Sequence, residues 1–171
     1  GLMMIQTGCR TKEALGLLVR DLELDTNVPH FQLRLNKIRP LKNLNSVRDV
    51  PIVGDLLDGL RDYVAGLDNT DPDAPLFPRY GHSKGMENIS AMLRTVVNVK
   101  MGLVGDKTCV PYSTRHSMKD KLRTLRSPME LQYAILGNGK RTVAEGYGDG
   151  NPLAYLQQEI IKAEKLESWG K

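Results

Sequence analysis

Basic side chains recur at short intervals in the segment "STRHSMKDKLR", which covers residues 113–123. Four of these basic side chains are charged at neutral pH: Arg115, Lys119, Lys121 and Arg123. A second basic segment covers residues 34–48, whereas acidic side chains gather elsewhere. A phosphate responds to local rather than net charge, so this segregation favours contact with DNA or RNA although the formal net charge is only +4. A solvated helix face is the alternative that a charge run alone leaves open.

Other kinds of chemical site have little support in the sequence. The histidines are scattered and form no HExxH pattern, so a zinc hydrolase is not expected; they are His30, His82 and His116. The stretch "GNGKRT" departs at two positions from the phosphate-binding loop of nucleotide-binding proteins. Cys9 and Cys109 form no CxxC pair, and we expect both to be reduced, with at least one in the core. We therefore predict no metal and no cofactor.

The composition is that of one globular domain, with 171 residues of which 40% are hydrophobic and 26% charged. Aromatic residues are scarce, and an apolar content rich in Leu, Val, Ile, Ala and Met favours helices packed by aliphatic side chains. We predict a mainly α fold with a small antiparallel β-hairpin or sheet. No apolar run approaches the roughly 18 residues of a membrane span, and no signal peptide is visible, so we expect a cytoplasmic protein without a membrane partner.

Periodic patterns predict the elements that must position the basic side chains. The opening "GLMMIQTG" resembles the second half of a helix, and helical spacing of apolar residues predicts further helices at 11–19, 54–65, 86–101 and, with interruptions, from 113 onward. The stretches "HFQLRLNKI" and "SVRDVPIV" predict two strands. Because "RPLKNLN" must turn between them, the two strands form a β-hairpin with a basic tip.

Three segments, taken in order, resemble the catalytic domain of tyrosine recombinases, the phage integrase family. They are "TGCRTKEALGL", "LKNLNSVRDVPIVG" and "YSTRHSMKDKLR…ILGNGKRTVAEGYG". The resemblance extends from the first helix to about Gly148, and it is specific because separate motifs recur in the family's order and at similar intervals. It implies the fold of that family and a site-specific DNA recombinase or integrase.

The resemblance implies four residues that act directly on the DNA phosphate. Arg10 matches the first catalytic arginine, in a turn where Glu13 supports the local fold, and Arg115 matches the second. Lys42, which precedes "RDVPI", matches the catalytic lysine and is preferred to Lys37. Tyr147 in "EGYG" matches the nucleophile, although Tyr155 lies only eight residues later.

The chain departs from the family at its two histidine positions. Tyr112 stands at the first, and Asn138 stands at the second, in the "LGNG" turn. A tyrosine hydroxyl and an asparagine amide can still form hydrogen bonds, but neither side chain titrates near pH 7 as histidine does. Two hypotheses follow: an active enzyme with slower chemistry, or a catalytically degenerate DNA-binding module derived from an integrase.

The implied chemistry joins these residues in one reaction on double-stranded DNA at attachment sites. The tyrosine attacks a phosphodiester to form a covalent 3′-phosphotyrosyl intermediate, the arginines stabilise charge on the phosphate, and the lysine protonates the leaving 5′-oxygen. Around this centre we expect further residues to contact DNA: Arg39, Arg48, Lys119, Lys121, Arg123, Lys140 and Arg141.

The resemblance also implies how the chain is organised. Residues 1–171 correspond to the catalytic domain, and the family's N-terminal DNA-binding domain is expected to be absent from this stretch. The segment 152–171 is expected to form a C-terminal helix that packs either on its own domain or on a neighbouring protomer. The full-length protein is expected to act as a tetramer on DNA, and this segment alone to be a monomer.

Overall fold

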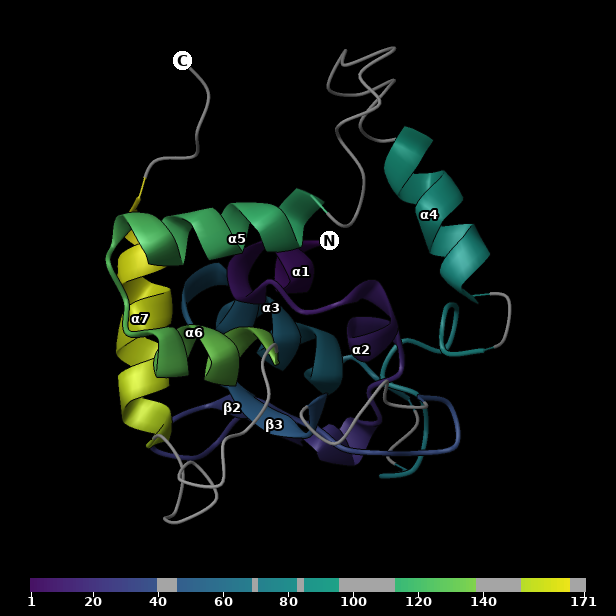
Figure 1. The fold of residues 1–171 in the computed structure, drawn as a ribbon. Coiled ribbons are helices and arrows are strands. Elements are labelled where there is room, and N and C mark those ends of the chain that lie inside the picture. The colour runs from purple at the N-terminus through teal and green to yellow at the C-terminus, as the bar shows by residue number, and fades with distance from the viewer. Residues whose placement is uncertain (40–45, 69–70, 83–84, 96–112, 138–151, 167–171) are drawn as a thin grey trace.

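The computed structural model describes residues 1–39, 46–68, 71–82, 85–95, 113–137 and 152–166. This part of the chain forms seven α-helices and one small sheet, and α4 lies to one side of the other elements (Figure 1). The helices are α1 (Leu2–Thr7), α2 (Thr11–Leu15), α3 (Gly54–Ala65), α4 (Gly85–Thr95), α5 (Ser113–Thr124), α6 (Met129–Leu136) and α7 (Leu153–Lys165). The strands are β1 (Leu22–Glu23), β2 (His30–Leu33) and β3 (Arg48–Pro51), and a 3-10 turn, η1 (Val19–Asp21), precedes β1. The predicted fold class is therefore confirmed.

The predicted hairpin is present as the antiparallel pair β2 and β3. Leu33 pairs with Arg48 at the end of the hairpin nearer the tip, and His30 pairs with Pro51 at the other end. Because successive side chains of a strand point to opposite faces, one face of the pair lies in the core, where Phe31 and Val50 are fully buried. The tip, residues 40–45, lies outside the described residues. β1 was not predicted, because a strand of two residues is too short to produce an alternating pattern; it adds to the edge of β2.

The helix predicted at 11–19 is shorter than expected. The pattern over 11–19 predicted one helix, but α2 ends at Leu15. The chain turns at Gly16, where a Cβ atom would lie 2.5 Å from the Cβ of Arg39, so Arg39 lies directly against this backbone. Beyond the turn, Val19 donates its N–H to the carbonyl of Ala74 instead of continuing the helix. Tertiary contacts therefore override the helical pattern of apolar residues here.

The remaining helices agree with the periodic patterns where the structure describes them. α3 has the predicted bounds 54–65, and α4 covers the described part of the segment 86–101. The apolar start forms α1, which ends at Gly8. Helix α7 packs on its own domain against β3, α6 and α5, and buries the apolar side chains of Leu156, Ile160 and Ala163. A contact between α7 and another protomer stays a prediction.

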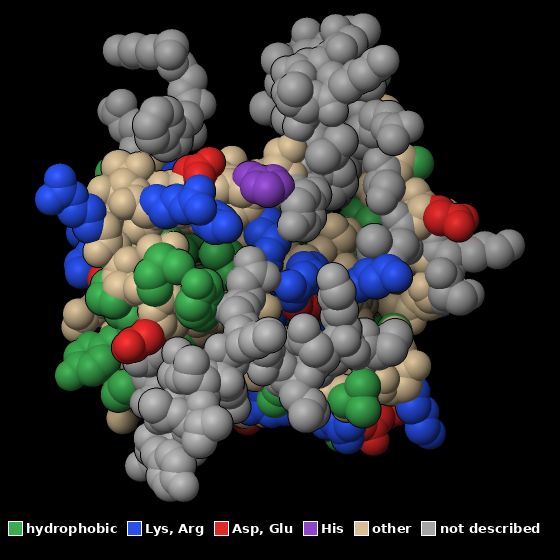
Figure 2. Space-filling model, viewed as in Figure 1, with side chains coloured by type: hydrophobic (Ala, Val, Ile, Leu, Met, Phe, Trp, Pro, Cys, Tyr) green, Lys and Arg blue, Asp and Glu red, His purple; other side chains and the backbone are tan. Residues whose placement is uncertain are grey.

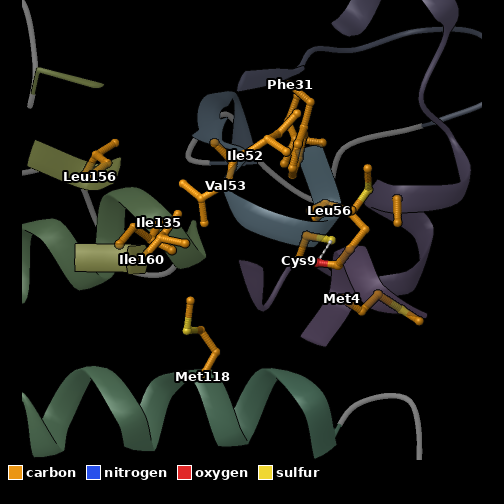
Figure 3. Close-up of a cluster of buried hydrophobic side chains, with 14 of the residues drawn as sticks. Met4, Cys9, Phe31, Ile52, Val53, Leu56, Met118, Ile135, Leu156 and Ile160 are labelled. Carbon is orange, nitrogen blue, oxygen red and sulfur yellow. Dashed lines mark hydrogen bonds between the residues drawn. The ribbon is translucent and has the colours of Figure 1, made fainter. Parts of the chain in front are cut away.

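The core lies between the sheet and the helices that cover it (Figure 3). Phe31 and Ile52 come from the hairpin, Met118 from α5 and Ile160 from α7, so segments distant in sequence share one apolar cluster. Cys9 is 2% exposed in this cluster, which confirms that at least one cysteine is in the core. None of the described helices is long and apolar enough to cross a membrane.

Candidate phosphate-binding site

The turn between α1 and α2 fixes the position of Arg10. Thr7 is buried, donates its hydroxyl to the carbonyl of Met3 at 2.6 Å and accepts the N–H of Cys9 at 3.2 Å. Gly8 adopts a left-handed conformation with φ of 65° and ends α1. A Cβ atom on Gly8 would lie 2.9 Å from the Cβ of Met118 in α5, so glycine also allows the two segments to approach closely. This turn places Arg10 at the N-cap of α2.

Glu13 then binds Arg10 from within the same turn. Its carboxylate accepts the backbone N–H of Arg10 at 2.8 Å, which is the N-terminal half of a capping box. It also accepts the Arg10 side chain, with Nη1 at 2.7 Å from Oε1. This arrangement requires a spacing of three residues between Arg10 and Glu13, because the N3 side chain must reach back to the N-cap. The expectation that Glu13 supports the local fold is consistent with these bonds.

Arg115 reaches the same region from α5. Arg115, Met118 and Leu122 form the buried side of this helix, with a spacing of three and four residues. The guanidinium donates to the carbonyl of Gly8 at 2.8 Å and to the carbonyl of Leu136. Gly8 and Arg115 are 107 positions apart in the chain. The fold therefore brings the second predicted arginine to the turn that holds the first.

Three arginines meet at the C-terminal end of α6. Consecutive carbonyls accept from different guanidinium groups: Ile135 from Arg48 Nε at 2.9 Å, Leu136 from Arg115, and Gly137 from Arg10 Nη2 at 3.5 Å. The last carbonyls of a helix have no partner within the helix and carry its negative partial charge. Guanidinium groups are therefore suited to this position. The same contacts fix α6 relative to α2, α5 and the hairpin.

The cluster carries an excess of positive charge. Its members are three guanidinium groups and one carboxylate: Arg10, Arg48, Arg115 and Glu13. Burial opposes ionisation of Glu13, but the hydrogen bonds and charges of Arg48 and Arg10 outweigh it and lower the Glu13 pKa to about 2. Glu13 is thus ionised at neutral pH, and these four side chains together carry two positive charges more than negative ones. Such a cluster can attract a phosphate.

Two residues predicted to contact DNA lie in the interior instead. Arg39 is 1% exposed, pairs with Asp21 at 3.2 Å and donates to the carbonyl of Glu13 at 3.3 Å. Arg48 is 8% exposed, and its guanidinium binds both carboxylate oxygens of Glu13, at 3.1 and 2.9 Å. Each of these two guanidinium groups is paired with a buried carboxylate, Asp21 or Glu13, which argues against a direct contact between Arg39 or Arg48 and DNA.

The interior position of Arg48 was missed although the sequence contained a signal for it. Successive side chains of a strand point to opposite faces, so Arg48 must lie on the same face as Val50 and Ile52. Those two residues are fully buried. The positive charges of the hairpin favoured a DNA contact for Arg48. The two-residue period of side chains along a strand instead predicts that Arg48 faces inward.

The predicted contacts on α5 lie at its surface but not on one side of it. Lys119 follows Arg115 by one turn, and Arg123 follows Lys119 by another, whereas Lys121 is rotated by about 200° from Lys119. Arg123 is exposed and lies 3.5 Å from Asp120, and the two lysines are half-buried. Figure 2 shows Lys and Arg side chains along α5 and in the area between α5, α2 and the end of α6. DNA contact by these residues stays a prediction.

Several predicted site residues lie outside the described part of the chain. They are Lys42, Tyr112, Asn138, Tyr147, Lys140 and Arg141. Two of them adjoin described residues: Asn138 directly follows Gly137, and Tyr112 directly precedes α5. Lys37, the alternative to Lys42, is exposed. Within the described ranges, no group of three His, Cys, Asp or Glu side chains could hold a metal ion.

Comparison with solved structures identifies the fold. No protein-family model and no curated protein matches the chain. The Tn1549 transposon integrase in complex with transposon right end DNA is similar, with a TM-score of 0.61 and 18% sequence identity over 94% of this chain and 56% of that one. The same integrase with circular intermediate DNA gives a TM-score of 0.62 and 18% identity. The chain thus spans little more than half the length of the integrase chains it matches. It has the fold of the Tn1549 transposon integrase, as the resemblance to tyrosine recombinases predicted.

Proposed function

We propose that this chain is the catalytic domain of a tyrosine recombinase that cleaves and rejoins double-stranded DNA. One observation carries the proposal: Arg10 and Arg115, the two arginines that the sequence motifs select, bind neighbouring carbonyls at the end of α6. The integrase structures that share this fold are complexes with DNA, which supports DNA as the partner. Attachment sites on DNA and a tetramer of protomers belong to the same proposal.

The reaction needs no metal and no nucleotide. The phenol oxygen of Tyr147 attacks the phosphorus, a bond forms between them, and the bond to the 5′-oxygen of the next nucleotide breaks. The phenol gives up its proton to solvent water, and Lys42 protonates the departing 5′-oxygen to give a hydroxyl. Arg10 and Arg115 stabilise the charge that develops on the non-bridging oxygens, since planar guanidinium groups can each donate two parallel hydrogen bonds. Rejoining of the strands reverses these bond changes.

A covalent adduct tests this proposal. The protein, in the longest form in which it is expressed, is incubated with nicked duplexes that carry candidate attachment sites. Cleavage near the nick releases a short 5′-hydroxyl fragment that diffuses away, so the adduct accumulates and a denaturing gel detects it. We expect an adduct that is lost in Tyr147→Phe and kept in Tyr155→Phe, the matched control on α7, where Tyr155 is 56% exposed.

A DNA-binding module without catalysis is the second candidate. Tyr112 and Asn138, which stand where the family has histidines, motivate it. In that case wild-type protein binds a correct site but forms no adduct, and Tyr147→Phe leaves DNA affinity unchanged. Reverting Tyr112 and Asn138 to histidine is then the next step, because histidine restores titratable groups at the two positions. Weakening of DNA binding by salt fits either candidate and does not separate them.

A further inference from the structure

Arg48 holds three separate segments together around the candidate site. Its Nη1 and Nη2 bind the Glu13 carboxylate of α2, its Nε donates to the carbonyl of Ile135 in α6 at 2.9 Å, and its Nη1 donates to the carbonyl of Ser46 at 3.1 Å. A planar guanidinium can make these bonds in several directions at once, which a lysine ammonium on a flexible stem cannot reproduce.

Two of the places that Arg48 contacts, Glu13 and the end of α6, also contact Arg10. Glu13 binds the backbone and side chain of Arg10, and Gly137 accepts from Arg10 Nη2. Arg48 lies directly against Gly137, since a Cβ atom there would be only 2.5 Å from Arg48 Nη1. The position of Arg10 is therefore coupled to Arg48 on two sides, through the carboxylate of Glu13 and through the end of α6.

Arg48 also limits how strongly Glu13 holds Arg10. The carboxylate shares its two oxygens between the two arginines: Oε1 accepts from Arg10 Nη1 at 2.7 Å and from Arg48 Nη1 at 3.1 Å. Without Arg48, the full negative charge of Glu13 would act on Arg10 alone and reduce the positive charge that Arg10 presents to a phosphate.

We propose that Arg48 is a positioning residue that orients Arg10 for attack on a DNA phosphate without touching DNA itself. This inference rests on the proposed function and deepens it. It replaces the predicted role of Arg48 as a DNA contact, and it assigns the hairpin, through β3, a part in holding the first catalytic arginine.

The test compares Arg48→Lys with Arg34→Lys. Arg34 lies on the same hairpin next to Arg48, donates to the Arg48 carbonyl at 3.1 Å and has a side chain that is 40% exposed. We expect Arg48→Lys to slow single-turnover adduct formation by about tenfold to a hundredfold, because small misplacements of a catalytic group have effects of that size. DNA affinity and its salt dependence should stay within about twofold of wild type, since the Arg48 guanidinium is paired with the buried carboxylate of Glu13 and, on this proposal, neutralises no phosphate. Arg34→Lys should change neither quantity.

Coupling through Glu13 provides a second kinetic readout. If Arg48 acts through the carboxylate, Glu13→Gln and Arg48→Lys are not additive, and the double variant is no slower than the slower single variant. Equal weakening of affinity and rate in Arg48→Lys, with a smaller salt slope, would instead identify Arg48 as a DNA contact and overturn the proposal.

NMR supplies a readout that does not depend on cleavage. The side-chain ¹⁵Nε and ¹³Cζ resonances of Arg10, assigned by their absence in Arg10→Lys, should shift in Arg48→Lys and stay in place in Arg34→Lys. If they stay in place in both variants, the positioning role is wrong whether or not the chain cleaves DNA. If they shift while the wild type forms no adduct on a site it binds, the proposed function fails and the structural coupling of Arg48 to Arg10 stands.

Discussion

At the scale of single residues, Glu13 connects the electrostatics of the site to the stability of the fold. Its carboxylate is buried and receives hydrogen bonds from Arg10 and Arg48. Breaking a buried ion pair by removing one partner costs about 3–5 kcal/mol, because the other charge stays buried without compensation. Glu13→Gln should therefore reduce the free energy of unfolding at neutral pH.

The lowered pKa of Glu13 also predicts a dependence on pH. Folding lowers this pKa from the ordinary value of 4.5 to about 2, so the stabilisation is fully present above about pH 4.5 and is lost as the pH falls toward 2. We expect wild-type protein to lose more stability between pH 5 and pH 3 than Glu13→Gln does, as measured by urea unfolding. Glu130→Gln, at an exposed position of α6, is the control and should follow the wild type. Parallel pH curves for wild type and Glu13→Gln would contradict this account.

Some members of the site were predictable from the sequence and others were not, for physical reasons. Arg10 belongs to a motif whose local turn the sequence encodes through Gly8 and Glu13, and Arg115 lies on the buried side of α5. Their meeting at the end of α6 depends on backbone carbonyls, which every residue has and which no sequence pattern marks. Arg48 was taken for a surface charge because positive residues are usually exposed, and only its pairing with Glu13 makes burial possible.

At the scale of elements, the end of α6 lies directly against Arg48. Gly137 has φ of 65°, and a Cβ atom there would lie 2.5 Å from Arg48 Nη1. Gly137→Ala should therefore destabilise the protein by about 1–3 kcal/mol through backbone strain alone, and displacement of Arg48 adds to this. Thermal or urea unfolding measures the change.

Gly59 provides the matched control for that substitution. It lies inside α3, is exposed, and a Cβ atom added to it meets no other atom within 4 Å. Gly59→Ala should stabilise the protein by up to about 1 kcal/mol, because alanine favours the helix more than glycine does. Equal effects at the two positions would show that close approach to Arg48 is not what requires glycine at 137.

Element prediction succeeded where local patterns were strong. α3 and the hairpin were predicted because apolar residues recur at helical spacing in one and alternate in the other. The helix at 11–19 was predicted too long, since the bond from Val19 to Ala74 and the packing of Arg39 on Gly16 are tertiary contacts. Such contacts between distant segments are absent from a local window of sequence.

At the scale of the whole molecule, α7 closes the core by packing on α5, α6 and β3. Ile160 is 1% exposed in that interface, whereas Tyr155 of the same helix is 56% exposed. Ile160→Ala should lower the free energy of unfolding by about 2–5 kcal/mol, and Tyr155→Ala should change it by no more than about 0.5 kcal/mol. Urea unfolding measures both. Similar small effects would mean that α7 contributes little to this domain and is available to another protomer.

The connections at the end of α6 have a consequence for synthesis of the protein. Arg10 contacts Gly137 across 127 positions, and Arg48 contacts Ile135 across 87. Contacts this distant in sequence form only after large loops have closed. A ribosome makes all three arginines of the cluster before it makes the carbonyls that orient them. A chain released before residue 135 therefore has the positive charge of the site without its geometry.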